Sequence, residues 1–466
     1  MRRTKIVATI GPACDEPGVL DNLVAAGVDV VRLNASHTAR EDLERRLAAV
    51  RASAERAGRH VGVMLDLGGP KLRVGVMTAG TVLAAGSSFA LLAGECVGDS
   101  SFAYVNHPGL AGDLSAGDKL LLDDGRLALR VTGTSDGRIE TLVEIGGPLG
   151  GHKGVNIPGV RLALDPLTDK DIDDLAWAIE AGIDLIAQSF VRGPEDVLRL
   201  RKAMGDRQIP IVAKIEKHEA AGDIESIVAA ADAVMVARGD LGVETSPEEV
   251  PVIQRAIVSA CRAGGKPVIV ATQMLESMVS AERPTRAEAS DVANAVFEGA
   301  DAVMLSAETA VGAHPVLAVE TMARICVTAE EYGGPPPHTA ALSRARDDVT
   351  RAVSAAVCSL ATDLELAAIV TATESGATAR AIASYRPSVP IVAITPEAAV
   401  ARRLALVWGV HPEVVPAPRN LEEMAGAATE VARATGFARP GDIIALTAGV
   451  ALNTPGTTDM VRVVHV

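Results

Sequence analysis

Eight short apolar runs recur through the first two thirds of the chain, separated by segments with helical spacing of apolar residues. Apolar runs of this length, bounded by turn residues, are typical of strands buried on both faces of a parallel sheet. Alternation of such runs with helices predicts repeated βα units. The predicted strands are Lys5–Ile10, Val28–Leu33, Val61–Leu65, Leu185–Phe190, Ile209–Ala213, Ala233–Ala237, Val268–Ala271 and Ala302–Leu305.

A polar residue stands at the carboxyl end of each predicted strand. Eight βα units with their chemistry gathered at these ends indicate a TIM (β/α)8 barrel. A doubly wound dinucleotide-binding sheet needs closely spaced glycines in its first turn, and Gly11-Pro12 does not provide them. The strand-end residues are Thr9, Arg32, Asp66, Ser189, Lys214, Asp240, Thr272 and Ser306.

The pattern changes between the third and fourth of these strands. Short runs with alternating polarity, separated by turn sequences, predict a small antiparallel β-barrel domain inserted into the TIM barrel. A Gly- and Pro-rich stretch at Glu331–Pro337 is a predicted linker, and a mixed α/β sheet follows it. We therefore expect a first barrel part at residues 1–69, an inserted β lid at 70–153, a second barrel part at 154–332 and a C-terminal α/β domain at 338–466.

Composition and charge limit the kinds of partner and compartment that are expected for this protein. The net charge of −15 disfavours nucleic-acid binding, which needs a basic face. No apolar segment is long enough to cross a membrane, and the five scattered cysteines form no metal-spaced pair. Reduced thiols in a cytoplasmic protein are therefore expected. Lys5 and the Asp15-Glu16 pair are expected to be solvated surface charges.

Two of the strand ends carry the strongest chemical signal. Lys214 and Glu216 lie two residues apart, which places both side chains on one face of a strand. Asp240 follows Gly239, where the backbone can approach a ligand closely. One or two carboxylates suffice for Mg²⁺, which fills its remaining positions with water and phosphate oxygens. An ordinary ion pair at a strand end is the alternative.

Motifs spread over nearly the whole chain resemble those of the pyruvate kinase family. Such a number of matches in one order makes a chance resemblance very improbable. The matching stretches are Thr4-Lys5-Ile6-Val7, Ile10-Gly11-Pro12, Arg32-Leu33-Asn34-Ala35-Ser36-His37, Lys153-Gly154-Val155-Asn156, Ala213-Lys214-Ile215-Glu216, Ala237-Arg238-Gly239-Asp240-Leu241-Gly242, Ala271-Thr272-Gln273-Met274-Leu275, Pro284-Thr285-Arg286-Ala287-Glu288 and Asp301-Ala302-Val303-Met304-Leu305-Ser306.

The resemblance implies phosphoryl transfer from phosphoenolpyruvate to ADP, giving pyruvate and ATP, as the last step of glycolysis. It implies that Glu216 and Asp240 hold Mg²⁺ (or Mn²⁺) and that Lys214 stabilises the transferring phosphoryl group and the enolate. It places Arg32 on the phosphate, the Gly239 and Asp240 backbone on the substrate carboxylate, and Thr272 beside the enolate.

The resemblance also assigns a nucleotide side and an assembly. Asn34, His37, Arg73 and Lys153 would line the nucleotide site, and the inserted domain would close over it as a lid. A homotetramer is expected. Ser306 and Glu308, at the end of the last strand, are interpreted as support.

One segment departs from the family pattern. Many members hold K⁺ near the positions of Asn34, Ser36, Asp66 and Leu67, in a segment reading Asp-Thr-Lys-Gly-Pro-Glu. This chain reads Asp66-Leu67-Gly68-Gly69-Pro70-Lys71. The ammonium of Lys71 near Asp66 would replace the charge of K⁺, which predicts a K⁺-independent enzyme.

A second departure concerns the C-terminal domain. Thr373, Ser375, Gly376, Ala377 and Thr378 follow a strand and open a helix, which is a suitable cradle for an anion. In the family this position binds a phosphorylated effector, with the loop Pro455-Gly456-Thr457-Thr458 nearby. Ala377 stands where a basic residue is common, so the identity of the effector stays open, as does a plain helix cap without a ligand.

Two other functions remain open at this level. A Mg²⁺-dependent aldolase or lyase on a related barrel would share Glu216 and Asp240 but would have no use for a lid or for Lys153. A non-catalytic relative that only binds an effector would be expected to have lost Lys214 or a carboxylate, and neither is lost.

Overall fold

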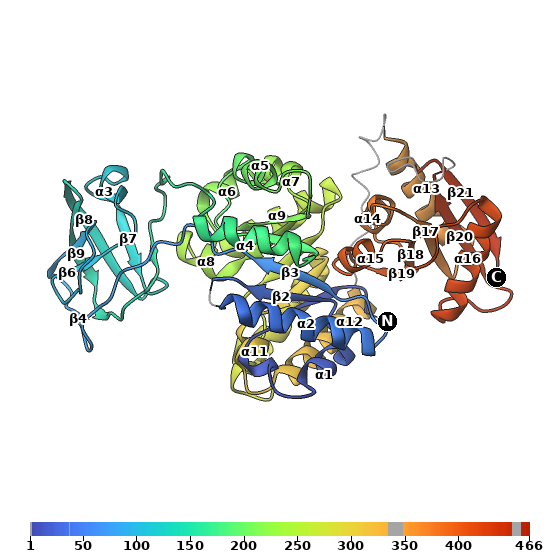
Figure 1. Cartoon of the computed structure of the whole chain (residues 1–466), viewed down its shortest axis with the longest axis horizontal. Coiled ribbons are helices and arrows are strands. Elements are labelled where there is room, and N and C mark those ends of the chain that lie inside the picture. Colours follow the sequence, from blue (N-terminus) through green and yellow to red (C-terminus); the bar gives the residue numbers. More distant parts are fainter. Residues whose placement is uncertain (1, 37, 334–347, 450–457) are drawn as a thin grey trace.

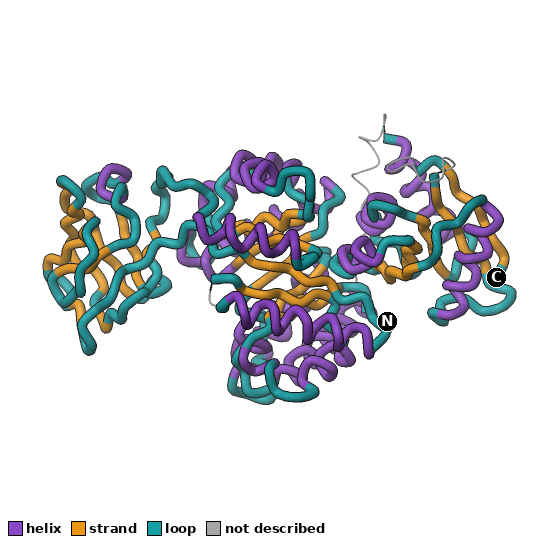
Figure 2. Tube along the Cα trace, in the orientation of Figure 1, coloured by secondary structure: helices purple, strands orange, loops and turns teal. Residues whose placement is uncertain are grey.

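The computed structural model describes residues 2–36, 38–333, 348–449 and 458–466. Three bodies follow one another along the long axis of the molecule, with an eight-stranded barrel in the middle (Figures 1 and 2). The inserted β domain lies at one end and the C-terminal α/β domain at the other. The barrel is closed, all its strand pairs are parallel, and its spatial order is β1-β16-β15-β14-β13-β12-β3-β2.

The barrel strands agree with the predicted ones to within two residues at their ends. Their carboxyl ends meet at one rim, because parallel strands in a closed barrel all point the same way. The strands are β1 (Lys5–Thr9), β2 (Val30–Asn34), β3 (Gly62–Asp66), β12 (Leu185–Gln188), β13 (Ile211–Ile215), β14 (Ala233–Ala237), β15 (Val268–Ala271) and β16 (Ala302–Leu305).

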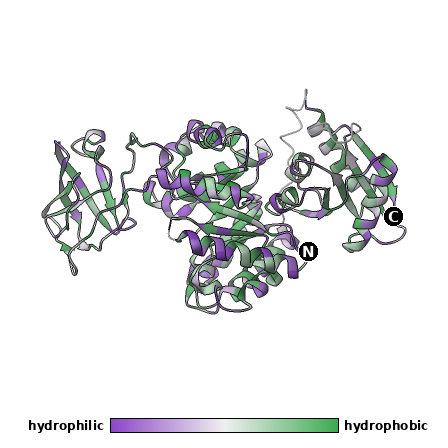
Figure 3. Cartoon of the chain, in the orientation of Figure 1, coloured by the Kyte–Doolittle hydropathy of each residue, from purple (hydrophilic) through white to green (hydrophobic). Residues whose placement is uncertain are grey.

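Helices surround the barrel, and the central strands are mainly hydrophobic while the outer helices mix polar and apolar residues (Figure 3). Thr168 and Asp171 form reciprocal capping bonds at the start of α4. The helices are α1 (Val19–Ala26), α2 (Arg40–Arg56), α4 (Asp169–Glu180), α5 (Pro194–Ala203), α6 (His218–Gly222), α7 (Ile224–Ala230), α8 (Arg238–Glu244), α9 (Val250–Gly264), α10 (Arg286–Glu298), α11 (Ala307–Ala310) and α12 (Pro315–Gly333), with 3-10 turns η1 (Pro12–Cys14) and η2 (Glu276–Val279).

The inserted domain holds a six-stranded sheet, ordered β11-β7-β8-β9-β5-β6, and a two-stranded sheet of β10 and β4. Its pairs are antiparallel except β5–β6, which is parallel. The elements are β4 (Val82–Leu83), β5 (Ser88–Leu92), β6 (Phe102–Tyr104), α3 (Leu110–Asp113), β7 (Lys119–Leu122), β8 (Leu127–Ser135), β9 (Arg138–Ile145), β10 (Gly147–Pro148) and β11 (Val155–Asn156). The last strand, β11, extends this sheet beyond residue 153.

The C-terminal sheet is mixed, as predicted. Four parallel strands lie in the order β19-β18-β17-β20, and β21 pairs with β20 antiparallel. The elements are α13 (Val349–Asp363), β17 (Ala368–Ala372), α14 (Ala377–Ser384), β18 (Ile391–Thr395), α15 (Ala398–Leu404), β19 (Val410–Val414), α16 (Leu421–Ala434), β20 (Ile443–Ala448) and β21 (Met460–His465).

The C-terminal domain closes the amino-terminal end of the barrel. Ala405 and Leu406, directly after α15, belong to the same buried cluster as the barrel residues Val30, Met64 and Met304. A Cβ added at Gly62 would lie 2.7 Å from the carbonyl oxygen of Arg402, so α15 and the start of β3 are in close contact. The opposite rim of the barrel, which carries the strand-end residues, is thereby left open for a site.

The environment of Lys5 differs from the prediction. Lys5 is 4% exposed, and its ammonium donates to the carbonyl oxygen of Val410 at 2.7 Å. It is buried where the C-terminal domain covers the barrel, a tertiary contact that a local reading of the sequence does not reveal. Among the described residues, no helix has the length and apolar character needed to cross a membrane.

Candidate active site

The ammonium of Lys214 is the centre of the polar cluster at the open rim. Its Nζ lies 2.7 Å from Ser189 Oγ, 2.9 Å from Glu216 Oε1 and 3.1 Å from Asp66 Oδ1. These partners come from the ends of β3, β12 and β13, three neighbouring strands of the barrel. All four residues are less than 9% exposed. The strand-end position therefore brings one cation and two carboxylates together out of bulk water.

The two buried carboxyl groups behave oppositely. Burial disfavours the ionised form of Asp66, but Lys214 and Arg32 outweigh it and lower the pKa. Burial raises the pKa of Glu216; Lys214 opposes this, and the negative charge of Asp240 adds to it. Burial also opposes the charge of Lys214, yet Asp66 and Glu216 outweigh it, so its pKa is raised. Lys214 is thus held as a cation.

Glu216 and Asp240 form a carboxylate pair suited to a divalent cation. Glu216 follows β13, Asp240 lies in the first turn of α8 after β14, and these two strands are paired. A cation between the carboxylates of Glu216 and Asp240 would relieve their mutual repulsion. Proteins usually bind Mg²⁺ through one or two carboxylates. Glu216 and Asp240 are therefore suitable ligands for Mg²⁺. Among the described residues, no group of three or more His, Cys, Asp or Glu side chains forms a denser metal site.

Arg32 and Thr272 flank this centre. Arg32 Nε and Nη2 each lie 2.7 Å from Asp66 Oδ2, and Nη1 donates to Thr9 Oγ1 at 3.1 Å. Thr272 has a φ of 67°, a conformation that is strained for a β-branched residue. Its hydroxyl accepts from Gly239 N at 2.8 Å and donates to Ala271 O at 2.6 Å. The strained turn fixes the hydroxyl against the start of α8.

The comparisons with known proteins agree with this architecture. The model of the pyruvate kinase barrel domain matches residues 1–319, and that of the pyruvate kinase alpha/beta domain matches residues 351–464. The chain belongs to the pyruvate kinase family. Membership makes it a phosphotransferase, and the family generally uses Mg²⁺.

Curated relatives support the same assignment over the full length. The chain is 45% identical over 472 residues to a pyruvate kinase of Geobacillus stearothermophilus, covering 99% of this chain and 80% of that protein. It is 44% identical over 470 residues to a pyruvate kinase of Methylorubrum extorquens, covering 100% and 98%. A pyruvate kinase of Clostridium acetobutylicum is 39% identical over 469 residues, with 99% of both chains covered.

The residues predicted to bind the nucleotide lie partly on the barrel and partly on the inserted domain. Asn34 ends β2, and its Oδ1 accepts from Ser36 N at 3.0 Å. Arg73 and Lys153 sit where the chain enters and leaves the inserted domain, and the antiparallel bridge between Arg73 and Gly154 brings these two segments together. Lys153 Nζ pairs with Asp123 Oδ1 at 2.8 Å within that domain. His37 lies outside the described residues.

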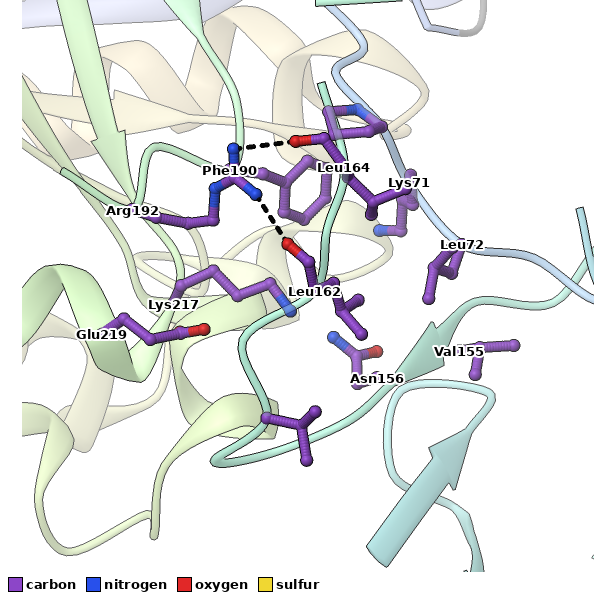
Figure 4. Close-up of a pocket in the computed structure, with 12 residues that line it drawn as sticks. Lys71, Leu72, Val155, Asn156, Leu162, Leu164, Phe190, Arg192, Lys217 and Glu219 are labelled. Carbon is purple, nitrogen blue, oxygen red and sulfur yellow. Dashed lines mark hydrogen bonds between the residues drawn. The ribbon is translucent and has the colours of Figure 1, made fainter. Parts of the chain in front are cut away.

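A small cavity lies at the hinge between the barrel and the inserted domain (Figure 4). On one side, Arg192 donates to the carbonyl oxygens of Leu162 and Leu164, each at 3.0 Å. Near the other side, Asn156 Nδ2 and Lys217 Nζ both bond Glu244 Oε1 at 2.7 Å. The segment that returns from the inserted domain at Asn156 is therefore bonded to α8, the helix that carries Asp240 in its first turn.

Lys71 makes a different contact from the one expected. Its Nζ lies 3.1 Å from Asp240 Oδ1, whereas the cations that contact Asp66 are Arg32 and Lys214. Leu67 is 1% exposed, and its carbonyl oxygen accepts from Ser189 Oγ at 2.8 Å. The positive charge of Lys71 thus stands beside Asp240 rather than beside Asp66.

The predicted effector loop forms a compact turn at the start of α14. Gly376 N donates to Thr373 Oγ1 at 2.9 Å, and Ala377 N donates to Ser375 Oγ at 3.4 Å. Gly376 has a φ of 78°, and an added Cβ there would lie 2.9 Å from the Leu404 side chain. Thr378 is hydrogen-bonded to Thr458, the one residue of the neighbouring predicted loop that the structure describes.

Two residues of the site were not predicted as functional. Ser189 was identified only as a strand-end residue, although its hydroxyl contacts both Lys214 and Asp66. Arg238 pairs with Asp291 at 2.6 Å and donates to the carbonyl oxygen of Thr272, also at 2.6 Å. The position of Ser189 at a strand end could have identified it as a site residue. For Arg238 the signal was its place beside Gly239, but its partner lies in α10, far along the chain.

Proposed function

We propose that the protein transfers the phosphoryl group of phosphoenolpyruvate to ADP, forming pyruvate and ATP. The observation that carries the proposal is the contact of Lys214 with both Asp66 and Glu216 beside Asp240. Phosphoryl transfer depends mainly on positioning and on neutralising charge, and a fixed cation next to a carboxylate pair provides both. Mg²⁺ held by Glu216 and Asp240 would supply charge neutralisation at the substrate.

The other residues then take defined roles. Lys214 stabilises the negative charge that develops on the phosphoryl group and on the departing enolate oxygen. Arg32 offers a forked donor to the phosphate, and its present partner Asp66 holds the fork in place. The hydroxyl of Thr272 lies between Ala271 O and Gly239 N, so it is fixed to assist proton delivery to the enolate carbon, with water as the relay.

The nucleotide side is proposed to form from Asn34 and His37 on the barrel together with Arg73 and Lys153 on the inserted domain. Lys153 would exchange its partner Asp123 for a nucleotide phosphate when the lid closes. Lid closure excludes water, which would otherwise compete with ADP as the acceptor of the phosphoryl group.

The test is pyruvate formation from phosphoenolpyruvate with Mg²⁺, measured with and without ADP. Turnover that requires ADP supports the kinase. Turnover without ADP would favour the aldolase or lyase, which shares the two carboxylates but needs no nucleotide. A complete lack of turnover, even with sugar phosphates and AMP added, would favour a non-catalytic relative that only binds an effector.

K⁺ independence is part of the proposal, with a revised reason. The ammonium of Lys71 adds a positive charge 3.1 Å from Asp240, and Leu67 offers no side-chain oxygen to a monovalent cation. The charge that K⁺ would bring to the substrate phosphate is thus already built into the chain. The assay compares turnover in K⁺ with turnover in tetramethylammonium. A large gain in K⁺ contradicts K⁺ independence without touching the kinase assignment.

We also propose that a phosphorylated effector binds at Thr373, Ser375, Gly376, Ala377 and Thr378. The start of α14, whose N-cap residue Gly376 makes no side-chain cap hydrogen bond, and the three hydroxyls support an anion cradle. The variants Ser375→Ala and Thr378→Ala should abolish activation by sugar phosphates or AMP. Activation that persists in both variants would exclude this loop. A homotetramer is proposed from family membership, and sedimentation velocity tests it.

A further inference from the structure

The guanidinium of Arg238 joins three elements of the barrel. Arg238 is the first residue of α8, two residues before the proposed Mg²⁺ ligand Asp240. Its Nη1 lies 2.8 and 2.6 Å from the two carboxylate oxygens of Asp291, on α10. Its Nε and Nη2 donate to the carbonyl oxygen of Thr272, which follows β15, at 3.2 and 2.6 Å. One side chain therefore connects α8, α10 and the turn after β15.

The turn that Arg238 contacts has an unfavourable backbone conformation. Thr272 and Gln273 have φ values of 67° and 54°, both in the left-handed region. Residues with a Cβ seldom adopt this region, and a β-branched residue such as threonine is poorly suited to it. Two consecutive residues in this conformation persist only where the surrounding structure holds them. The turn after β15 therefore depends on its tertiary contacts.

Buried contacts hold this turn on both sides. Besides the carbonyl oxygen of Thr272, the guanidinium of Arg238 contacts the sulfur of Met274, with Nη2 at 2.8 Å. Arg238 is 9% exposed and Met274 is 0% exposed, so water competes little with these contacts. After the turn, the backbone N–H of Leu275 donates to Glu308 Oε1 at 3.2 Å. The guanidinium of Arg238 thus holds the side of the turn that carries the Thr272 hydroxyl.

The conformation of Thr272 also sets the direction of its hydroxyl. Oγ1 donates its proton to Ala271 O and accepts from Gly239 N, which leaves its second lone pair free to accept from a water molecule. In the proposed reaction, such a water protonates the enolate. Its proton goes to C3, the electrons of the C2–C3 double bond form the new C–H bond, and the C2 oxygen regains its double bond. Solvent then returns a proton to the water oxygen.

We propose that Arg238 is a positioning residue for protonation of the enolate, and that it acts by holding Thr272 in the strained turn. The inference rests on the proposed kinase reaction and separates its two chemical steps. Phosphoryl transfer relies on Lys214, which Ser189 and Asp66 hold through contacts that do not involve Arg238. Protonation relies on the turn after β15. Loss of the guanidinium should therefore impair protonation more than phosphoryl transfer.

The experiment measures the two steps separately in the full chain. ATP formed from phosphoenolpyruvate and ADP in a single turnover with Mg²⁺ reports phosphoryl transfer. Exchange of the methyl protons of pyruvate in D₂O, with Mg²⁺ and ATP present, reports the proton step and is followed by proton NMR. The exchange is informative because the group that assists protonation of C3 also assists removal of that proton in the reverse direction. The readout is the exchange rate divided by the rate of ATP formation.

Three variants define the expected result. Arg238→Met should lower the ratio at least tenfold, because the carbonyl oxygen of Thr272 loses its donors. Asp291→Asn should lower it by a smaller factor, because the guanidinium loses its charged partner. Arg51→Met is the matched control and should keep the wild-type ratio. Arg51 also pairs with an aspartate, Asp184, at 2.7 Å and donates to backbone carbonyl oxygens.

A double variant tests whether Arg238 acts through Thr272. The hydroxyl is already absent in Thr272→Ala, so adding Arg238→Met to that variant should lower its residual exchange rate by less than twofold. Two residues that act through one group are not additive in their effects, whereas independent residues are. A further tenfold loss in the double variant would overturn the assignment of Arg238 as a positioning residue for Thr272.

Failure of this inference differs from failure of the proposed function. A wild type that forms ATP, together with an unchanged ratio in Arg238→Met, would overturn the role of Arg238 and leave the kinase assignment intact. A wild type that forms no ATP from phosphoenolpyruvate and ADP would overturn the proposed function, on which the inference rests. If Arg238→Met does not fold, Asp291→Asn decides, and an unchanged ratio in that variant refutes the inference.

Discussion

The ammonium of Lys71 lies 3.1 Å from the carboxylate of Asp240, which is one of the two proposed ligands of Mg²⁺. The two side chains are each about 30% exposed, with values of 29% and 30%, so solvent weakens their attraction but does not abolish it. The same ammonium lies 5.9 Å from the centre of the Phe190 ring. A cation built into the chain therefore stands beside a proposed Mg²⁺ ligand, where the proposed phosphoryl transfer needs positive charge.

Replacing Lys71 with methionine should make the enzyme respond to K⁺. We expect turnover in tetramethylammonium to fall by about tenfold, which corresponds to about 1.4 kcal/mol of transition-state stabilisation, and K⁺ to restore part of it. The Mg²⁺ concentration for half-maximal activity should also fall, because Asp240 loses a competing cation. The exposed-lysine variant Lys119→Met serves as control. A Lys71→Met enzyme that is indifferent to K⁺ would show that Lys71 does not replace the ion.

Replacing Lys214 with methionine should reduce kcat by about a thousandfold or more, because a charge stabilising the transition state is lost. Glu216 would remain buried without its cation, so we also expect a stability loss of about 3 kcal/mol. Kinetics and urea unfolding measure the two effects separately.

Lys217→Met is the matched control for that variant. Lys217 is paired with the buried carboxylate of Glu244 at 2.7 Å, so its removal should cost similar stability while kcat stays within about tenfold of the wild type. Equal losses of kcat in Lys214→Met and Lys217→Met would mean that Lys214 acts through the fold rather than on the substrate.

Ser189→Ala tests a positioning residue. Its hydroxyl accepts from Lys214 and lies 3.2 Å from Asp66, so removal should let the ammonium move and reduce kcat by about 10- to 100-fold. Loss of an acceptor also disfavours the charged amine, so the alkaline limb of the pH–rate profile should shift to lower pH. Ser189→Thr, which keeps the hydroxyl, should recover most of the activity. A lower kcat with an unchanged alkaline limb would argue against a direct effect on Lys214.

The barrel was predictable from the sequence because every strand is short, apolar and followed by a polar residue. Buried parallel strands leave a continuous hydrophobic signal, and Ile211–Ile215 and Ala233–Ala237 carry it clearly. Short edge strands leave no such signal. Phe102–Tyr104 and Gly147–Pro148 were not predicted, since two or three residues cannot show a period and their pairing depends on distant partners.

The site was predictable to the extent that its residues end strands. Lys214, Glu216 and Asp240 converge because the closed barrel brings the ends of β13 and β14 to one rim. The partner of Lys71 was not predictable. Lys71 follows Pro70 beyond the end of β3, so its position in the sequence does not decide between Asp66 and Asp240 as the partner.

Lys5 should produce a measurable rise of stability in alkaline solution. Burial lowers its pKa from 10.5 to about 8; Asp29 opposes this shift, and Arg2 and Arg59 add to it. Between about pH 8 and 10.5 the unfolded chain keeps the Lys5 proton while the folded chain has released it, so the free energy of unfolding increases with pH. Over this whole pH range, Lys5 raises the free energy of unfolding by about 3 kcal/mol.

The measurement compares urea unfolding of the wild type and Lys5→Met at pH 7.5 and pH 9.5. The difference between the two proteins isolates Lys5, because the buried cysteines titrate alike in both; burial raises the pKa of Cys326 and of Cys358 to about 12 in each case. We expect the wild type to gain stability relative to Lys5→Met as the pH rises. Parallel pH dependences would mean that the Val410 carbonyl and Asp29 hold Lys5 in its charged form throughout this range.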